Sequence, residues 1–281
     1  MSYSCFDLDI SNNIAHITLS RPEKRNSMPP LFWDELPEAV MDIDLNSKAR
    51  VIVISSTGPH FTAGLDISAF LGGGGDSSED EVLDSGGASF YRKIKRMQQS
   101  FTALEECRIP VLAAIQGGCI GGGVDLTTAC DMRYSTDDAF FVIQETNIGM
   151  TADVGTYPRL LNLIPEGIVR ELSYTGRRMP AAEAKDFGLL NNIYSDQQTM
   201  LDAVMGIAAE IATKAPLAVH GCKHMITYSR DHNTADSLDY IGIWNASMLK
   251  SDVMMEAITA NGEKRVGNFD ELPKVSLYNA K

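Results

Sequence analysis

Apolar and polar residues follow two different periods along this chain, and these periods predict strands alternating with helices. Residues 13–19 alternate between apolar and polar side chains, as expected for a strand with one buried face. Residues 51–55 are an almost unbroken apolar run, which is typical of a strand buried on both faces. Apolar and β-branched residues return at 111–115 and 132–135, where we expect further strands.

Apolar residues at helical spacing lie between these strands. The first such set, which predicts a helix, is Phe32, Leu36, Val40 and Ile43. We expect Pro37 to kink or interrupt this helix, because proline cannot donate the intrahelical hydrogen bond. The second set is most simply a core-facing stripe and consists of Phe90, Ile94, Met97, Phe101 and Leu104. Residues 72–81 are polar and glycine-rich, so they predict a solvated loop or a cover over a ligand pocket.

The last third of the chain is predicted to be helical. One apolar face consists of Leu201, Val204, Ile207, Ala208 and Ile211. A later one consists of Leu238, Ile241, Trp244, Met248 and Leu249. Helices with this apolar load pack either on the core or between subunits. We therefore divide the chain into an α/β core, residues 1–200, and a helical segment, residues 201–281.

Composition and charge restrict the function. The chain has 281 residues, of which 44% are hydrophobic and 22% charged, as in an ordinary globular protein. Its net charge of −13 argues against nucleic-acid binding, because no broad basic face neutralises phosphates. Five scattered cysteines indicate free buried thiols rather than disulfides or a zinc site.

Targeting signals are not evident in the sequence. We expect no signal peptide, because the first residues lack a basic region followed by an apolar run, and no membrane span, because no stretch approaches 18 apolar residues. The last three residues, Asn-Ala-Lys, are not the Ser-Lys-Leu peroxisomal signal. We therefore expect a cytoplasmic location, with a mitochondrial or peroxisomal one as the alternative.

A glycine-rich segment carries the clearest chemical signal. Residues 116–125 follow the apolar run at 111–115 and lead into a predicted helix start. Consecutive glycines let the backbone approach a ligand, and the first N–H groups of a helix have no intrahelical acceptor. Three carboxylates, Asp125, Glu145 and Asp153, flank this segment. Together these features predict proton transfer beside a carbonyl whose oxygen gains negative charge.

Each of these features also has a purely structural interpretation. Asp125 alone could be a carboxylate that stabilises the first turn of a helix. Asp153 alone could be an exposed loop residue or a helix N-cap. If Asp153 is buried among its small and apolar neighbours, desolvation should raise its pKa. The glycines at 121–123 do not form a P-loop, because no Lys-Ser/Thr pair follows them, and they do not form a dinucleotide-binding motif, because the G-x-G-x-x-G spacing is not met.

Taken together and in this order, the segments resemble the crotonase family, also called the enoyl-CoA hydratase/isomerase superfamily. The resemblance covers nearly the whole chain and lies in residues 20–26, 60–66, 121–125, 182–189 and 262–265 and at Glu145. It implies an α/β fold, a spiral of ββα units with a C-terminal helical segment. It also implies an acyl-CoA thioester substrate for the core and trimers, commonly paired into hexamers, for the helical segment.

The resemblance assigns further residues to the site. The backbone N–H groups of Leu65 and Gly122 would form an oxyanion hole for the thioester oxygen. Lys24, Arg25 and Lys264 match basic positions that meet CoA phosphates, although ordinary surface charge is the alternative for all three. Backbone around Ala63 and Ile67 would face the adenine.

The carboxylate pattern is similar to that of the Δ3,5-Δ2,4-dienoyl-CoA isomerase subgroup. Hydratases of the family carry glutamates at the positions of Asp125 and Glu145 and usually a glycine at Asp153. In this subgroup a 3,5-dienoyl thioester of fatty-acid β-oxidation becomes the 2,4-diene, with a proton lost at C2 and another gained at C6. Glu145 would be the base at C2 and Asp153 the acid at C6, or the reverse, and Asp125 would hold the electrostatics or orient Glu145.

The expected reaction needs no metal or redox cofactor, because proton transfer alone completes it. Two alternatives are an enoyl-CoA hydratase or Δ3,Δ2-isomerase, for which Asp153 would be incidental, and a non-catalytic protein of the same fold.

Overall fold

The strands lie in two sheets within residues 3–70 and 88–276, which the computed structural model describes. The larger sheet has the order β1 (Phe6–Ser11), β2 (Ile14–Leu19), β3 (Val51–Ser56), β4 (Val111–Ile115), β6 (Met132–Thr136), β9 (Asn192–Tyr194). The smaller sheet has the order β5 (Gly118–Ile120), β7 (Phe140–Val142), β8 (Met179–Pro180). Pairs β1–β2 and β7–β8 are antiparallel and the other pairs are parallel.

Helices connect and cover the strands. Their bounds are η1 (Pro22–Lys24), α1 (Phe32–Leu45), α2 (Ile67–Phe70), α4 (Ala88–Glu106), α5 (Gly122–Ala129), η2 (Glu145–Ile148), α6 (Thr156–Leu160), α7 (Glu166–Thr175), α8 (Ala181–Asp186), α9 (Gln197–Ala212), α10 (Pro216–Asp231), α11 (Thr234–Met248) and α12 (Ser251–Glu263). The predicted loop at residues 72–81 lies outside the described residues.

Successive units of the chain repeat one pattern. β4 joins the larger sheet, β5 joins the smaller one, and α5 follows; β6 and β7 repeat this sequence before η2 and α6. An earlier unit repeats this pattern in part. After β3 the chain reaches the smaller sheet, where Thr62 forms an isolated bridge with Cys119 of β5. The structure thus has the predicted spiral of ββα units, and each crossing between the sheets brings a loop to the same region.

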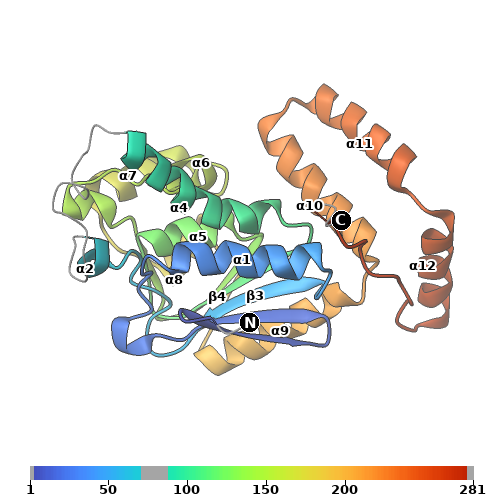
Figure 1. Cartoon of the computed structure of the whole chain (residues 1–281), viewed down its shortest axis with the longest axis horizontal. Helices are drawn as coiled ribbons and strands as arrows, with labels where there is room; N and C mark the ends of the chain where they lie inside the picture. The colour runs from blue at the N-terminus through green and yellow to red at the C-terminus, as the bar shows by residue number, and fades with distance from the viewer. Residues whose placement is uncertain (1–2, 71–87, 277–281) are drawn as a thin grey trace.

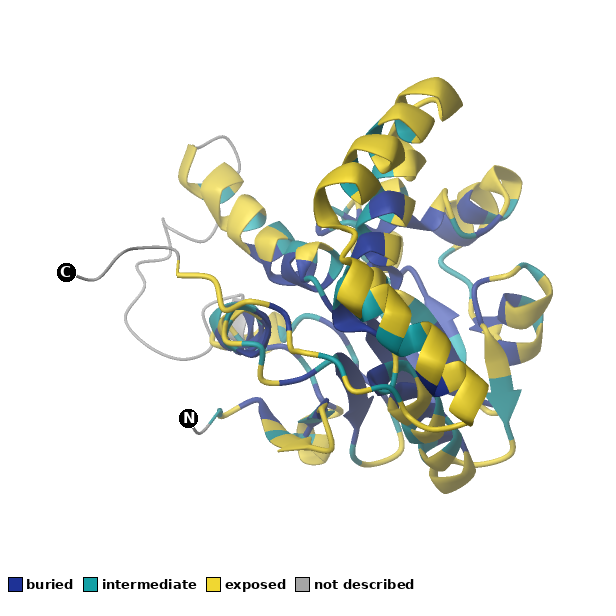
Figure 2. Ribbon diagram, turned by 90° about the vertical axis from the view of Figure 1, so that its right-hand side faces the viewer, coloured by how far each residue is buried: buried dark blue, intermediate teal, exposed yellow. Residues whose placement is uncertain are grey.

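Both faces of the larger sheet are covered, one by α1, α4 and α5 and the other by α9 (Figure 1). In β3, Ile52 and Ile54 face the main hydrophobic core, which α1, α4 and α5 share. The alternate residues Val51 and Val53 face a second core on the other side of the sheet, which α9 completes. β3 is therefore buried on both faces, as its apolar run predicts, and the buried residues form a continuous centre in Figure 2.

The prediction that Pro37 breaks the first helix is wrong. α1 continues through Pro37 from Phe32 to Leu45. The proline leaves the carbonyl of Trp33, four residues earlier, without its usual N–H donor. The hydroxyl of Ser100 on α4 donates to that carbonyl at 2.6 Å, inside the core. A bond from a neighbouring helix thus replaces the missing one within the helix.

We expect Ser100→Ala to lower the free energy of unfolding by about 1–3 kcal/mol, because it leaves a buried carbonyl without a donor. Urea denaturation measures this change. Thr175→Ala is the matched control, since this exposed hydroxyl also bonds a backbone carbonyl of a helix. A loss at Ser100 no larger than at Thr175 would contradict this role.

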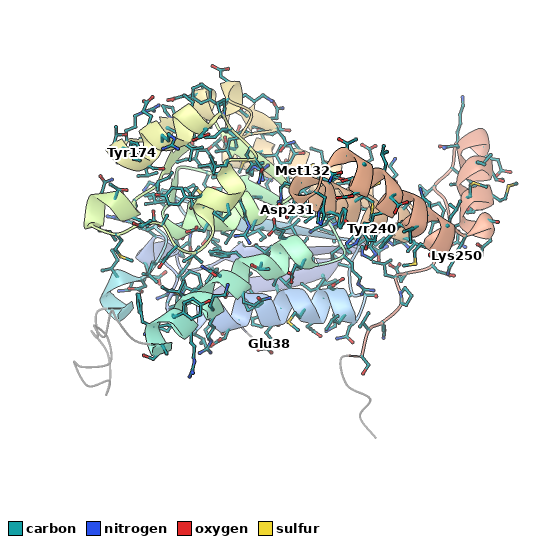
Figure 3. All side chains as sticks on the ribbon, turned by 90° about the horizontal axis from the view of Figure 1, so that it is seen from above. Glu38, Met132, Tyr174, Asp231, Tyr240 and Lys250 are labelled. Carbon is teal, nitrogen blue, oxygen red and sulfur yellow. The ribbon has the colours of Figure 1, made fainter. Side chains whose placement is uncertain are left out.

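The helices after α9 extend away from the sheets (Figures 1 and 3). The proposed boundary at residue 200 falls inside α9, which packs on the larger sheet, so the extended part begins at α10. α10 packs beside α11, and many of their apolar side chains are exposed in the single chain. Cys222 is exposed there too, unlike the four other cysteines. No helix in the described ranges is long and apolar enough to cross a membrane.

Candidate active site

The glycine-rich segment forms a turn between β5 and α5. Gly121 is the N-cap residue, with φ at +52°, and Gly122 is the first residue of α5. This helix begins where the sequence predicts and is buried along its whole length. The buried guanidinium of Arg133 donates to carbonyls at the opposite end of α5, those of Thr127 and Cys130. The helix is thus fixed at its far end, with its free N–H groups beside the turn.

A second turn, at Gly64 and Leu65, lies against the first. Met28 N–H donates to the Gly64 carbonyl at 2.8 Å, which fixes this turn to the preceding segment. A Cβ atom added to Gly64 would lie 2.5 Å from the Ile120 carbonyl oxygen, and one added to Gly122 would lie 3.7 Å from the Leu65 nitrogen. The Leu65 and Gly122 amides are therefore neighbours, and within the described chain neither N–H has a hydrogen-bond acceptor.

These two amides border a pocket with mostly apolar walls. Its lining includes Trp33 of α1 together with Phe90, Met97, Ile148, Met150 and Val154. All three predicted carboxylates, Asp125, Glu145 and Asp153, line the same pocket. The fold thus brings together side chains from α5, η2 and the turn before α6. Paired N–H donors and carboxylates in an apolar pocket can stabilise an oxyanion and transfer protons beside it.

Asp125 is the most deeply buried of the three carboxylates, at 1% exposure. Its Oδ1 atom accepts hydrogen bonds from the Thr156 N–H at 2.6 Å and the Thr156 hydroxyl at 2.8 Å. Burial, and next the nearby charge of Glu145, raises the pKa of Asp125 to about 7, although the Thr156 bonds oppose this rise. Asp125 therefore also links α5 to the start of α6.

Glu145 and Asp153 are only partly buried. Burial raises the pKa of Glu145, and the charge of Asp153 adds to this effect. The Glu145 Oε2 atom is buried and, within the described residues, has no hydrogen-bond partner, so it can receive a proton. Burial also raises the pKa of Asp153, as predicted from its small and apolar neighbours. Asp153 is not the N-cap of α6, because Gly155 occupies that position.

Comparison with known proteins identifies the family. A model described as enoyl-CoA hydratase/isomerase matches residues 9–272. The chain belongs to the enoyl-CoA hydratase/isomerase family. It is 44% identical, over 256 residues, to the mitochondrial Δ(3,5)-Δ(2,4)-dienoyl-CoA isomerase of Mus musculus, and the match covers 90% of this chain and 77% of that protein. It is 40% identical to the peroxisomal Δ(3,5)-Δ(2,4)-dienoyl-CoA isomerase of Arabidopsis thaliana, with 93% and 94% covered.

The fold of the family is evident from solved structures as well. An enoyl-CoA hydratase from Bacillus anthracis superposes with a TM-score of 0.84 at 27% identity, over 95% of this chain and 99% of that one. These findings confirm the resemblance that the sequence motifs predict, including the isomerase subgroup.

The structure places the predicted CoA-binding residues in two groups. Ala63 and Ile67 line the pocket, and the Ala63 N–H donates to the Arg25 carbonyl at 2.9 Å, so Lys24 and Arg25 lie near the pocket. Both basic residues are exposed. Lys264 directly follows α12, which lies on the opposite side of the molecule from α2 (Figure 1). A single chain therefore does not bring Lys264 to the pocket.

Thr156 is the site residue to which the sequence analysis assigns no role. It lies 31 residues from Asp125, and no local pattern predicts their contact. Its only signal is its position after a glycine, at the start of α6. Among the described residues, no three His, Cys, Asp or Glu side chains are arranged to hold a metal ion.

The raised pKa of Asp125 predicts a pH-dependent stability. Between its ordinary value of 3.8 and about 7, the folded chain binds more protons at Asp125 than the unfolded chain does. Its contribution to stability therefore falls as pH rises through this window. We expect Asp125→Asn to remove this fall and to be more stable than wild type at pH 8, by at most about 4 kcal/mol at about 1.4 kcal/mol per pKa unit.

Urea unfolding at pH 4.5 and pH 8 measures this difference. The side-chain amide that replaces the Asp125 carboxylate keeps an oxygen that can accept hydrogen bonds from Thr156. Asp186→Asn, at an exposed position of α8, is the control and should leave the pH dependence unchanged. Equal stability of wild type and the Asp125 variant at both pH values would contradict a buried Asp125 carboxyl with a raised pKa.

Proposed function

We propose that this chain isomerises 3,5-dienoyl-CoA to 2,4-dienoyl-CoA in fatty-acid β-oxidation. The observation that carries the proposal is the presence of three carboxylates around one apolar pocket, beside two neighbouring amides. A hydratase needs two carboxylates to place a water, whereas moving a proton from C2 to C6 requires a base and an acid at separate carbons. The names of the relatives from Mus musculus and Arabidopsis thaliana support the same reaction.

In the proposed mechanism, Glu145 removes the C2 proton through its unpartnered Oε2 atom. The negative charge that develops is delocalised over the dienolate and is largest on the thioester oxygen. The Leu65 and Gly122 N–H groups donate to that oxygen, where the charge is greatest in the transition state. Asp153, whose pKa is raised by desolvation, donates a proton at C6.

Asp125 would hold the electrostatics of the pocket beside the two other carboxylates. After burial, the charges of Glu145 and Asp153 raise the pKa of Asp125, and the charge of Asp153 adds to the raised pKa of Glu145. Because the reaction is reversible, Glu145 and Asp153 exchange the roles of base and acid with direction. Proton transfer alone completes the isomerisation, so the proposal includes no cofactor beyond the CoA of the substrate.

Substrate recognition and assembly are further parts of the proposal. Lys24 and Arg25 would meet the phosphates of CoA at the entrance to the pocket. Lys264 would reach them only from a second copy, because α12 extends away from the pocket of its own chain. The helices α11 and α12 have the apolar surface for a homotrimer or hexamer, since Leu238, Ile243 and Ile258 are each more than half exposed. Light scattering would measure the mass.

The compartment of the chain is also a proposal. The relatives from Mus musculus and Arabidopsis thaliana are named mitochondrial and peroxisomal, respectively. These names favour the organellar alternative over the cytoplasmic location first expected from the sequence. Fractionation of cells that express the natural protein would test it.

The decisive experiment is the ultraviolet absorbance of 3,5-octadienoyl-CoA after enzyme is added. The product diene is conjugated with the thioester and absorbs at longer wavelength, so turnover is seen directly. Crotonyl-CoA is assayed in parallel. Isomerisation with little hydration would support the proposal, whereas hydration of crotonyl-CoA without dienoyl turnover would replace it with the hydratase alternative.

A further inference from the structure

One turn, residues 153–156, contains one of the three carboxylates and binds a second. It contains Asp153 itself, and it ends in Thr156, whose N–H and hydroxyl both bind Asp125. Any displacement of the turn would therefore move Asp153 and release Asp125 at the same time. The contacts that hold this turn therefore affect the groups of the proposed reaction.

A buried arginine lies directly against the turn. Gly155 has φ at +135°, and a Cβ atom added there would lie 2.0 Å from Nη1 of Arg159. The guanidinium thus occupies the space that any larger side chain at position 155 would need. Arg159 is itself only 9% exposed, although it carries a full charge. A charge buried to this degree requires a partner, or its desolvation would be costly.

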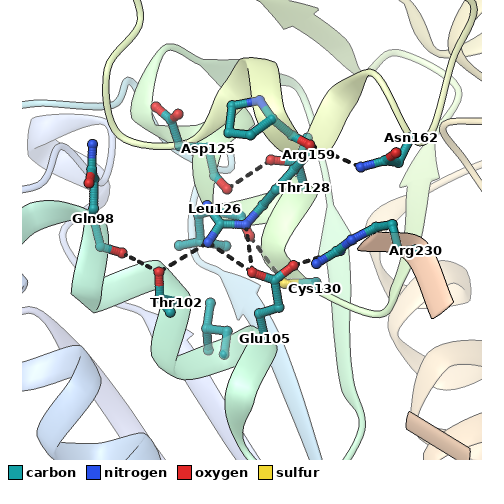
Figure 4. A network of polar contacts seen from close by, with 12 residues as sticks. Gln98, Thr102, Glu105, Asp125, Leu126, Thr128, Cys130, Arg159, Asn162 and Arg230 are labelled. Carbon is teal, nitrogen blue, oxygen red and sulfur yellow. Dashed lines mark hydrogen bonds and ion pairs between the residues drawn. The ribbon is translucent and has the colours of Figure 1, made fainter. Parts of the chain in front are cut away.

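That partner is Glu105 of α4. Its Oε2 atom accepts from Nε of Arg159 at 3.2 Å and from Nη2 at 3.1 Å (Figure 4). The same Nη2 atom donates to the Thr102 hydroxyl at 3.2 Å. Arg230, from α10, forms an ion pair with the other oxygen of Glu105 at 2.6 Å. One carboxylate of α4 therefore anchors two arginines, one against the catalytic turn and one from the helical extension.

α4 holds the other end of the turn as well. The side-chain amide of Gln98 donates to the backbone carbonyl of Asp153 at 2.7 Å. Gln98, Thr102 and Glu105 follow one another at spacings of four and three residues, so they lie on one face of α4. This face contacts the turn at Asp153 and at Gly155, through Arg159.

We propose that Arg159, anchored on Glu105, is a positioning residue that fixes the 153–156 turn and thereby both Asp153 and the Thr156–Asp125 bonds. The inference rests on the proposed function, because it concerns the geometry of the proposed acid. A buried ion pair that served stability alone would change unfolding and leave the turnover of folded enzyme intact. A positioning residue changes kcat in enzyme that is still folded.

The test compares Arg159→Lys, Arg159→Ala and Glu105→Gln with wild type. We expect kcat for 3,5-octadienoyl-CoA to fall up to about 10²-fold in Arg159→Ala, since small misplacements of catalytic groups have effects of this size. We expect KM to change less than about threefold and Arg159→Lys to retain more activity. The control is Arg170→Ala, which removes an exposed ion pair on α7 and should leave kcat unchanged.

Chemical rescue separates positioning from stability. A cavity lined by Thr102, Glu105 and Gly155 opens beside the guanidinium. Millimolar guanidinium chloride should therefore partly restore kcat of Arg159→Ala and leave Arg170→Ala unaffected. Glu105→Gln, which keeps the shape of its side chain, provides the measurement if Arg159→Ala does not fold. Unchanged kcat in the folded variants would overturn the proposal.

Wild-type activity distinguishes this inference from the proposed function. If wild type lacks dienoyl turnover but hydrates crotonyl-CoA, the proposed function fails. The positioning of Asp125 through Thr156 is then measured by the hydration kcat of the same variants. A reduced hydration kcat with rescue would support the inference, and an unchanged kcat would overturn it.

Discussion

Glu145→Gln and Asp153→Asn should each lower kcat for 3,5-octadienoyl-CoA by about 10²–10⁴-fold, the usual contribution of a general acid or base. In either direction of the reaction one of the two carboxylates accepts a proton and the other donates one. The amide of Gln or Asn does neither near neutral pH. We therefore expect kcat to fall to a similar extent in both variants, in the forward and in the reverse reaction.

The stability of these variants provides the internal check. Burial raises the pKa of both carboxylates, so an uncharged amide at either position should leave the melting temperature unchanged or higher. A loss of kcat in such folded protein is then a loss of chemistry. The control is Glu166→Gln, at an exposed position of α7. Activity within tenfold of wild type for Asp153→Asn would show that this aspartate is incidental.

Gly64→Ala should lower kcat by about 10²–10³-fold, the typical effect of losing one oxyanion-hole donor. Gly64 has φ at +78°, and its added Cβ would lie 2.5 Å from the Ile120 carbonyl oxygen and 2.9 Å from the Gly122 nitrogen. Both contacts are with backbone, which cannot move aside as a flexible side chain can. The variant must therefore separate the two turns that place the Leu65 and Gly122 amides together.

Gly206→Ala is the matched control for this prediction. Gly206 lies in α9, where an added Cβ meets nothing within 4 Å, and alanine favours a helix by about 1 kcal/mol. Calorimetric titration with a saturated acyl-CoA would show whether the Gly64 variant still binds CoA. Folded Gly64→Ala protein with kcat within fivefold of wild type would be inconsistent with an oxyanion hole at these amides.

The sequence predicts those features whose signal is local. The strand at residues 51–55 is evident because two hydrophobic faces give it a continuous apolar run. The start of α5 at Gly122 is evident because glycines followed by a carboxylate mark a helix N-terminus. β7 and β8 are two or three residues long, too short for any period to be seen, so the smaller sheet is not predicted.

Features that depend on distant contacts cannot be predicted in this way. α1 continues through Pro37, and the carbonyl of Trp33 that the proline leaves without a donor is satisfied by Ser100, 63 residues later in the sequence than Pro37. Similarly, three carboxylates are evident as candidates, but the two bonds from Thr156 to Asp125 appear only once α5 and α6 are in contact. The roles of Glu145, Asp153 and the two amides remain predictions for the experiments above.

The order of elements along the chain has a consequence for how this protein is made. The second core lies between strands that end by Thr136 and α9, which begins only at Gln197. During synthesis, the apolar face that includes Val51, Val53 and Leu112 therefore leaves the ribosome well before its covering helix. At about 5–20 residues per second, the roughly 60 intervening residues take several seconds. Over that interval the nascent chain is prone to aggregate, and chaperones that bind apolar strands have their opportunity to act.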